Sequence, residues 1–324
     1  MNDESRMYEL EYPAPLMNYD SSQGPVLIVA LQGYADAGLA VESAASHLKD
    51  ALGSRPVVSF NNDEFVDYRS RRPAVTMQHH VISDVEDISL DIRVIRDNVD
   101  KPFMLLSGPE PDMRWQTFSK AVADLVERYK ISKTICLYAA PMTVPHTRQL
   151  VVSAHGNDPE LVPNMVTFDS RMTFPGSAAL FLERELHERG LNVAGYVAHV
   201  PHYIASSYYP EATFQLLRAV QDSTGLKFPL GALKLDMKKT KEQLADYETG
   251  NPEIAQVVAS LEEQYDQEVE YYMSKHPDTL MPGERSLPTG DELGAEFERF
   301  LASIDHQDDE PGAPGDSEDS LDDE

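Results

Sequence analysis

Charged and polar residues follow several apolar segments of this sequence, and their types can do chemistry. The clearest stretch is GPEPDMRW (108–115), which comes directly after the apolar segment KPFMLLS and holds Glu110, Arg114 and the only tryptophan. A carboxylate can act as a general base, and a guanidinium can bind an anion through two parallel hydrogen bonds. We predict that one crevice is lined by the following residues: Gly33, Asp36, Arg69, Arg72, Glu110, Arg114, His146, Arg148 and His202.

These residues allow two interpretations. In one, Arg69, Arg72 or Arg148 holds a small anionic ligand bidentately. Glu110 then accepts hydrogen bonds or acts as the base, and one of the two crevice histidines transfers a proton, because imidazole titrates near neutral pH. In the other, the arginines of VDYRSRRP pair with acids of the same chain, such as Glu64, Asp67 or Glu110. The sequence alone assigns no catalytic residue.

Several familiar site motifs are missing from the sequence. QGYADAG (32–38) contains neither GxGxxG nor GxxxxGKS/T, so we favour a tight turn capped by Asp36 over a nucleotide-binding loop. There is no GxSxG or HExxH, and the adjacent His79 and His80 would point to opposite faces of a strand. The single cysteine, Cys136, excludes a multi-cysteine zinc site. We therefore predict no metal and no cofactor.

The elements that must position these residues alternate between strand and helix. The apolar run PVLIVAL (25–31) is typical of a strand buried on both faces, and apolar residues recur at helical spacing between Val41 and Leu52. Further strands are predicted at 57–60, 65–69, 74–79, 90–96, 101–107, 133–139 and 192–200. Further helices are predicted at 114–130, 177–189 and 210–224. This alternation predicts a three-layer α/β sandwich with a mostly parallel or mixed sheet, and a crevice at the carboxyl ends of its strands.

The pattern changes after Gly225. Heptad-like apolar spacing on both sides of ETGNPE (248–253) predicts a helical hairpin, and Leu293 to Leu301 predict a third short helix. The segment 274–290 is rich in Pro, Gly and Ser and is expected to be a linker. We predict three parts: an α/β domain at 1–228, a helical C-terminal region at 229–302 and a disordered acidic tail at 303–324.

Composition restricts the partners. The net charge is −28, and residues 303–324 contain ten acids without a lysine or arginine, so no nucleic-acid partner is expected. The sequence contains no run of about 18 apolar residues, so no transmembrane helix is predicted. The N-terminal MNDESRMYEL lacks the apolar core of a signal peptide, and a single cysteine suits a reducing compartment. We expect a cytoplasmic protein with no membrane partner.

Six segments in order carry a family resemblance: LQGYADAG, VDYRSRRP, GPEPDMRW, APMTVPHTR, FPGSAALFLERELHERG and VAHVPHYIA. Together they resemble the proteasome assembly chaperone 2-like family (PAC2 family), in its longer actinobacterial form, over roughly residues 20–225. The resemblance implies an α/β sandwich similar to phosphorylase and hydrolase folds, and a homo-oligomer, expected to be a trimer. It carries no catalytic assignment onto these residues.

Two functional hypotheses follow. The favoured one is a non-enzymatic, oligomeric interaction protein that acts as an assembly chaperone, because a family likeness is present and a recognisable catalytic motif is missing. The alternative is a protein that binds or acts on a small anionic or nucleoside-like ligand in the crevice, as a phosphorylase-like fold would allow by analogy.

Overall fold

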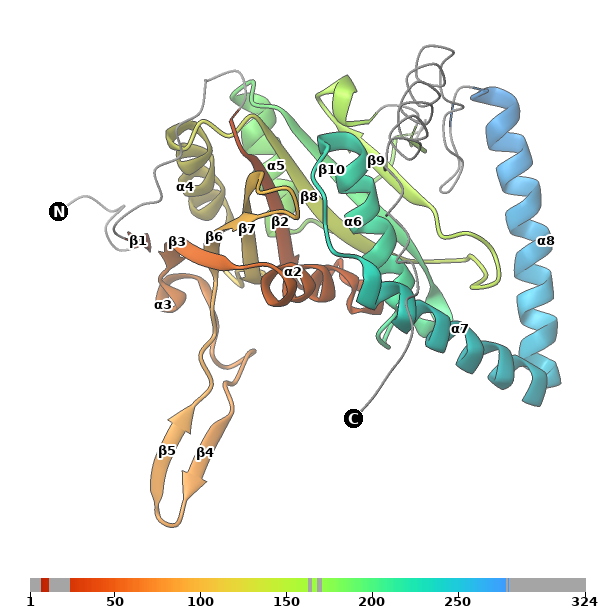
Figure 1. The fold of residues 1–324 in the computed structure, drawn as a ribbon, viewed down its shortest axis with the longest axis horizontal. Helices are drawn as coiled ribbons and strands as arrows, with labels where there is room; N and C mark the ends of the chain where they lie inside the picture. Colours follow the sequence, from red (N-terminus) through yellow and green to blue (C-terminus); the bar gives the residue numbers. More distant parts are fainter. Residues whose placement is uncertain (1–6, 12–23, 163–164, 168–170, 278, 280–324) are drawn as a thin grey trace, which may run out of the picture. The chain divides into compact units, whose positions relative to one another are not determined.

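The fold is seen in a computed structural model that describes residues 7–11, 24–162, 165–167, 171–277 and 279. Its centre is an eight-stranded sheet with the order β1-β3-β6-β7-β2-β8-β10-β9 (Figure 1). The strands of this sheet are β1 Tyr8–Leu10, β2 Val26–Gln32, β3 Ser54–Phe60, β6 Asp91–Arg96, β7 Pro102–Pro109, β8 Lys133–Met142, β9 Val152–Gly156 and β10 Val193–Pro201. A separate two-stranded sheet contains β4 Val75–Gln78 and β5 Val81–Val85.

The helices follow the alternation that the sequence predicts. They are η1 Ala37–Leu39, α2 Ala40–Ala51, α3 Asn62–Phe65, α4 Trp115–Arg128, η2 Pro159–Leu161, α5 Ala178–Glu188, η3 His202–Ile204, α6 Pro210–Thr224, α7 Gly231–Gly250 and α8 Pro252–Lys275. In the described part of the chain, no helix is long and apolar enough to cross a membrane.

The middle of the sheet is parallel and its flanks are antiparallel. Strand β2 pairs in parallel with β7 and with β8, and β8 pairs in parallel with β10. Strands β6, β3 and β1 continue one flank in antiparallel pairs, and β9 is antiparallel to β10 on the other. The carboxyl ends of β7, β2, β8 and β10 therefore lie along one edge of the sheet, which places the loops after them next to one another.

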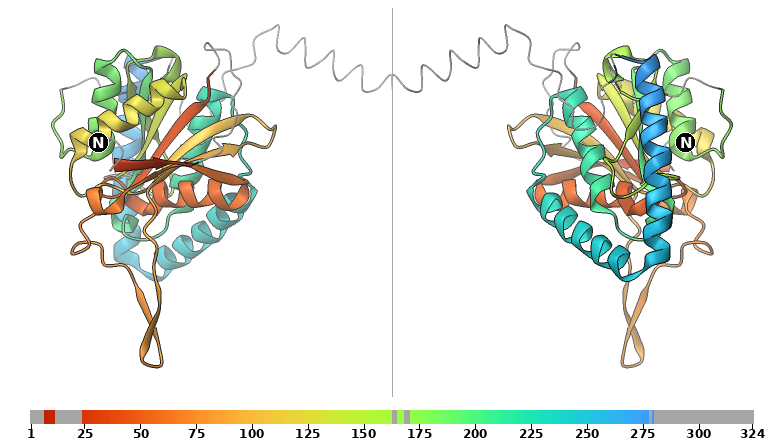
Figure 2. Two further views of the ribbon diagram at one scale, coloured as in Figure 1. Left: turned by 90° about the vertical axis from the view of Figure 1, so that its left-hand side faces the viewer. Right: turned by 90° about the vertical axis from the view of Figure 1, so that its right-hand side faces the viewer.

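Two apolar cores lie on the two faces of the sheet and make the three-layer sandwich. Helices α2 and α6 cover one face, with Ile28 and Ala30 of β2 in their core. Helices α4 and α5 cover the other face, with Leu27 and Val29 of β2 in theirs (Figures 1 and 2). Alternate residues of a strand point to opposite faces, so a strand covered on both sides has a continuous apolar sequence.

One predicted strand is wrong. Residues 65–69 do not form a strand: they contain the end of α3 and a turn. Two local side-chain bonds explain the difference, because the side chain of Asn61 accepts the N–H of Asp63 and the carboxylate of Asp67 accepts the N–H of Arg69 at 3.0 Å. Such bonds offer the backbone an alternative to strand pairing.

The C-terminal helices of the described region are mostly exposed. Helix α7 buries Leu233, and α8 buries Val258, Leu261 and Tyr265. Asn251 lies between the helices, and Pro252 begins α8, as ETGNPE predicts. The predicted short helix, most of the predicted linker and the predicted acidic tail lie outside the described residues.

Candidate functional site

The predicted crevice residues follow strands that end at the same edge of the sheet, but most of them belong to two separate polar clusters, and Asp36 and His202 belong to neither. The first cluster surrounds the loop after β7. The second fixes the loop after β8 to helices α7 and α8. No hydrogen bond or ion pair between described residues joins the two clusters.

Glu110 in the first cluster holds the start of α5. Its Oε1 atom accepts the N–H of Ala178, the first residue of that helix, at 2.6 Å. The first N–H groups of a helix have no partner inside the helix, and a negative charge there is favourable. Gly33 lies beside this carboxylate: a Cβ atom at position 33 would be 2.4 Å from Glu110 Oε2. The absence of a side chain at Gly33 thus makes room for the Glu110 contact.

The arginines near this loop differ in whether they have polar partners, and two of them do. Arg71 donates from Nε to Asp112 Oδ1 at 3.1 Å and from Nη2 to the carbonyl oxygen of Glu110 at 3.1 Å. Arg114 forms an ion pair with Glu64. These contacts fit the interpretation in which arginines bind acids of the same chain.

Arg69 and Arg72 differ from these two. Both are exposed, and within the described part of the chain neither guanidinium has an ion-pair partner. They are the two free cations of the first cluster.

Asp36 lies on the α2 side of the sheet and binds the start of a helix. Its Oδ1 accepts the N–H of Val41 at 2.7 Å, and its Oδ2 accepts the N–H of Glu42 at 3.1 Å, both in the first turn of α2. Burial raises the pKa of this carboxyl, and the two N–H groups act in the opposite direction. The N-cap position of α2 is Leu39, not Asp36 as predicted; the Asp36 carboxylate reaches the first turn of α2 from the residue before η1.

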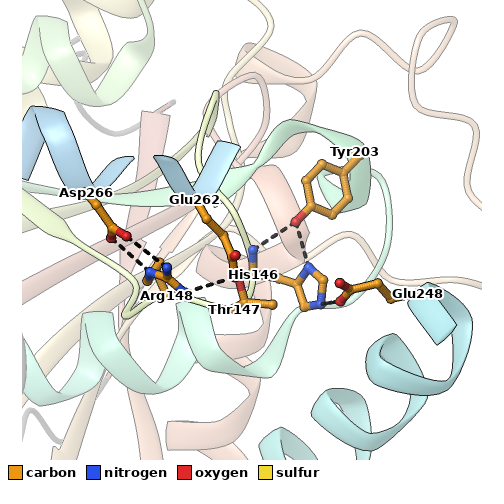
Figure 3. A network of polar contacts seen from close by, with 7 residues as sticks. All are labelled: His146, Thr147, Arg148, Tyr203, Glu248, Glu262 and Asp266. Atoms are coloured by element: carbon orange, nitrogen blue, oxygen red, sulfur yellow. Dashed lines mark hydrogen bonds and ion pairs between the residues drawn. The ribbon is translucent and has the colours of Figure 1, made fainter. Parts of the chain in front are cut away.

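His146 in the second cluster is held by Tyr203 (Figure 3). The Tyr203 hydroxyl lies 2.8 Å from the backbone nitrogen and 2.7 Å from Nδ1 of His146. Because the hydroxyl oxygen accepts the backbone N–H, its own hydrogen is free to go to Nδ1. A neutral His146 then carries its proton on Nε2, which faces Glu248 Oε2 at 3.7 Å. Burial lowers the pKa of His146, and the charges of Glu248 and Glu262 oppose that effect in part.

Arg148 binds two acids of α8 (Figure 3). Its Nε and Nη2 atoms donate to the two oxygens of Asp266 at 2.9 and 2.8 Å, and Nη1 donates to Glu262 Oε1 at 2.9 Å. Thr147 donates to the same Glu262 oxygen. The hydrogen bond from Arg148 lowers the pKa of Asp266. A bidentate pair of this kind occupies the guanidinium, so an anionic ligand would have to displace α8.

His202 is exposed in η3 and takes no part in the His146–Tyr203 hydrogen bonds; its ring packs edge-on against Tyr203 at 5.4 Å. A small hollow between α6 and α7 is lined in part by His146, Glu211 and Lys241. Burial raises the pKa of Glu211. The described residues contain no group of three or more side chains that could hold a metal ion.

Comparison with known proteins decides the family. The family model described as PAC2 family matches residues 30–248. The chain belongs to the PAC2 family. Among solved structures, a protein of unknown function from Corynebacterium glutamicum is 55% identical, with 82% of this chain and 99% of that chain covered and a TM-score of 0.79. No match to the chain was found among curated proteins.

Two structures from Mycobacterium tuberculosis are also similar. A protein of unknown function is 41% identical, with 82% of this chain and 92% of that chain covered and a TM-score of 0.78. A proteasome-assembly chaperone homologue is 26% identical, with 72% and 99% covered and a TM-score of 0.66. The resemblance that the six sequence segments indicate is therefore confirmed, and so is the α/β fold.

The acids of α7 and α8 in this PAC2-family chain were missed by sequence reasoning. Glu262 and Asp266 are four residues apart, so they lie on the same side of a helix. That spacing is a signal for a matching arginine elsewhere, but acids are so common in this chain that the signal does not stand out.

A buried polar group under α5 was also missed. Tyr138 donates to Glu183 Oε1 at 2.5 Å, and His155 Nε2 lies 2.9 Å from Glu183 Oε2. A Cβ atom at Gly195 would lie 2.4 Å from the His155 ring, so this strand glycine makes room for the ring. Burial alone would lower the pKa of His155, but the hydrogen bond and charge of Glu183 outweigh burial and raise it.

Proposed function

We propose that this PAC2-family protein is a non-enzymatic, homo-oligomeric interaction protein that acts as an assembly chaperone. One observation carries the proposal. Glu110, Arg71, Arg114 and Arg148 lie at the carboxyl edge of the sheet, where an α/β enzyme would bind its substrate, and each is bonded to another segment of the same chain. They fasten loops and helices, which suits a surface of fixed shape.

Three candidates for chemistry have a structural partner, whereas the exposed Arg69 and Arg72 have no ion-pair partner among the described residues. Glu110 accepts a helix N–H, Arg148 holds two carboxylates of α8, and His146 shares its Nδ1 atom with Tyr203. A general base needs a lone pair directed at a substrate, and an anion clamp needs a free guanidinium. A ligand that used Glu110, Arg148 or His146 would require these bonds to open first, so we favour the interaction protein.

Similarity to a chaperone homologue also supports a role in protein interaction. The Mycobacterium tuberculosis structure at 26% identity is described as a proteasome-assembly chaperone homologue. We propose that the partner of this chain is likewise a protein, that the proteasome is the first assembly to test, and that the working form is a trimer in the cytoplasm. The charge of −28 supports a protein partner over a nucleic acid.

The test measures binding and assembly together. The full chain is mixed with purified proteasome subunits, and native mass spectrometry follows both complex formation and the appearance of assembled particles. We expect a complex between the oligomer and unassembled subunits, and faster assembly in its presence. No complex and no change in assembly would refute the chaperone proposal.

A ligand screen tests the alternative. Thermal unfolding is measured with phosphate, nucleosides and acidic metabolites for the wild type and for Arg148→Ala. A ligand present at 100 times its dissociation constant stabilises a protein by about 2.7 kcal/mol. Stabilisation that disappears in Arg148→Ala would support ligand binding and contradict a purely structural role of this arginine.

A further inference from the structure

The first half of α7 is a basic surface in an acidic chain. Residues 227–241 contain five lysines and one acid, whereas residues 242–274 contain nine acids and no lysine or arginine. The whole chain has 55 Asp and Glu residues against 27 Lys and Arg residues. Positive charge is therefore concentrated on one short part of the surface.

Three of these lysines lie on one side of α7. Lys234, Lys238 and Lys241 follow one another at four and three residues, which is the spacing of neighbours on a helix surface. We call these three residues the lysine stripe. All three are exposed. The Nζ atom of Lys234 lies 5.8 Å from the centre of the Phe214 ring, so this end of the stripe lies beside α6.

The charge of the stripe is little compensated within its own chain. Lys238 forms a loose ion pair with Glu242 at 3.9 Å, and the two side chains are 76% and 65% exposed. Among the described residues Lys234 and Lys241 form no ion pair, although Lys241 lines the same hollow as Glu211. The acids of α8 lie on a helix that diverges from α7 (Figures 1 and 2). The stripe can therefore meet a negative group from another molecule.

We propose that the lysine stripe docks a short acidic segment of the protein partner. The inference rests on the proposed function, in which the partner is a protein, and it names the chemistry of the segment that meets α7. Complementary charges across an interface speed the encounter and select the partner more than they add affinity. A contact of this kind is reversible, which suits a partner that is released after assembly.

The length of the stripe favours a short peptide over a long polyanion. The distance along the helix axis from Lys234 to Lys241 is roughly 10 Å, because an α-helix rises about 1.5 Å per residue. An extended peptide covers this distance with about three or four residues. A nucleic acid or an anionic membrane continues beyond the stripe and meets a chain with a net charge of −28, which repels it.

The first test compares two charge-matched double variants of the full chain. Lys234→Glu with Lys238→Glu reverses the charge of the stripe, and Lys120→Glu with Lys130→Glu makes the same change at two exposed lysines in and after α4. Fluorescence anisotropy measures the binding of a labelled hexapeptide of glutamate at low salt. We expect the stripe variant to bind at least tenfold more weakly than the wild type, and the α4 variant less than threefold more weakly. Circular dichroism and thermal unfolding check that both variants fold.

Further probes define the class of ligand. A hexapeptide of glutamine should not bind, and binding of the glutamate peptide should weaken as salt is added, because salt screens charges on an exposed surface. If a short DNA strand or an anionic phospholipid vesicle binds as tightly as the glutamate peptide or more tightly, and the stripe variant loses that binding, the inference is overturned in favour of that polyanion. Glutamate-peptide binding that is absent, that is equal in all three proteins, or that appears only after residues 303–324 are removed would overturn it as well.

A second experiment separates this inference from the proposed function. Both variants are compared with the wild type in the binding and assembly assay with proteasome subunits. If only the stripe variant loses at least tenfold in affinity for the subunits, the inference and the chaperone proposal are both supported. If all three proteins bind subunits equally, the inference fails and the chaperone proposal is unaffected. If the stripe binds the glutamate peptide and no subunit binds the wild type, only the chaperone role fails.

Discussion

Individual residues at the carboxyl edge of the sheet join segments that are far apart in the chain. Tyr203 is a clear case, because one hydroxyl oxygen accepts the backbone N–H of His146 while its hydrogen serves Nδ1 of the same residue. The His146 side chain is only 6% exposed, so water cannot easily replace the hydroxyl. Loss of one partner leaves a buried polar group unsatisfied, which costs more than the bond itself contributes.

Tyr203→Phe should therefore destabilise the protein. The variant removes the hydroxyl and keeps the ring, leaving two polar atoms of His146 without this partner. We expect a loss of about 1–3 kcal/mol in the free energy of unfolding, measured with urea. Tyr208→Phe is the control, because Tyr208 is exposed and the described contacts give its hydroxyl no hydrogen bond, so its change should stay within about 0.5 kcal/mol. Equal effects of the two substitutions would contradict this role of Tyr203.

His146 and His155 should make the free energy of unfolding depend on pH in opposite directions. The folded pKa of His146 lies below the ordinary value of 6.5, so its stabilising contribution is complete above pH 6.5 and is lost as pH falls through the folded pKa. His199, whose pKa burial lowers to about 4, acts in the same direction. The folded pKa of His155 is raised, so its contribution is complete below pH 6.5 and is lost as pH rises through that pKa.

Urea unfolding between pH 4.5 and pH 8 measures these contributions. We expect His146→Gln to reduce the loss of stability on the acid side, and His155→Gln to reduce the loss on the neutral and alkaline side. A wild-type curve whose shape is unchanged by both substitutions would refute the assignment.

Among the elements, α8 depends on a few polar contacts. It buries three residues, and Arg148 fixes its middle through Glu262 and Asp266. Exposed ion pairs contribute about 0–1 kcal/mol each to global stability. A helix that buries little apolar surface opens locally at low cost, so such pairs matter more for the position of α8 than for the stability of the whole fold.

Arg148→Ala should loosen α8 selectively. We expect faster hydrogen exchange in α8 while the global free energy of unfolding falls by no more than about 1 kcal/mol. Lys238→Ala is the matched control, since Lys238 pairs with Glu242 inside α7 and joins no other element. Unchanged exchange in α8 of Arg148→Ala would show that apolar packing alone holds the helix.

The sequence predicted most helices and strands of the fold, but it did not predict which strands pair with the main sheet. The apolar runs at β2, β7 and β8 are continuous because both faces are covered, and that pattern is visible without coordinates. The strand predicted at 74–79 exists as β4, but a strand pattern does not tell whether the strand joins the main sheet. Pairing is decided by tertiary contacts, which leave no local signal.

For the candidate site, the sequence predicted which loops lie at one edge of the sheet. It did not predict that their polar residues form two separate clusters. The carboxyl ends of parallel strands must share an edge, so Glu110 and His146 both lie there. Their division into two clusters depends on which helix meets each loop. Glu110 meets α5, and Arg148 meets α8, through partners 68 and 118 residues away in the chain. Spacing along the sequence carries no information about such pairs.

At the scale of the whole molecule, α7 and α8 lie at the end of a fold whose main sheet is complete before them. Phe228 packs against Phe103 of β7 at 5.5 Å, so the chain up to that residue belongs with the sheet. Met237 and Leu244 of α7 are partly buried and pack against the core under α2 and α6. We propose a domain boundary at residue 228.

A chain ending at residue 228 should fold. We expect a single cooperative unfolding transition at a lower temperature than for a chain ending at residue 277, because the surface of α6 under α7 becomes exposed. Thermal unfolding followed by circular dichroism compares the two. The absence of a cooperative transition in the shorter chain would contradict the boundary and make α7 and α8 part of one folding unit.

The order of the strands also limits how subunits can join. The outermost strands are β1, with three residues, and β9, whose Ser153 already bridges to Val166. Short or covered outer strands offer few free backbone groups to a strand of another molecule. Growth by continuous sheet extension, the route to fibres, is therefore disfavoured at both rims. Copies of this protein should form finite particles, and the solution should stay clear at high concentration.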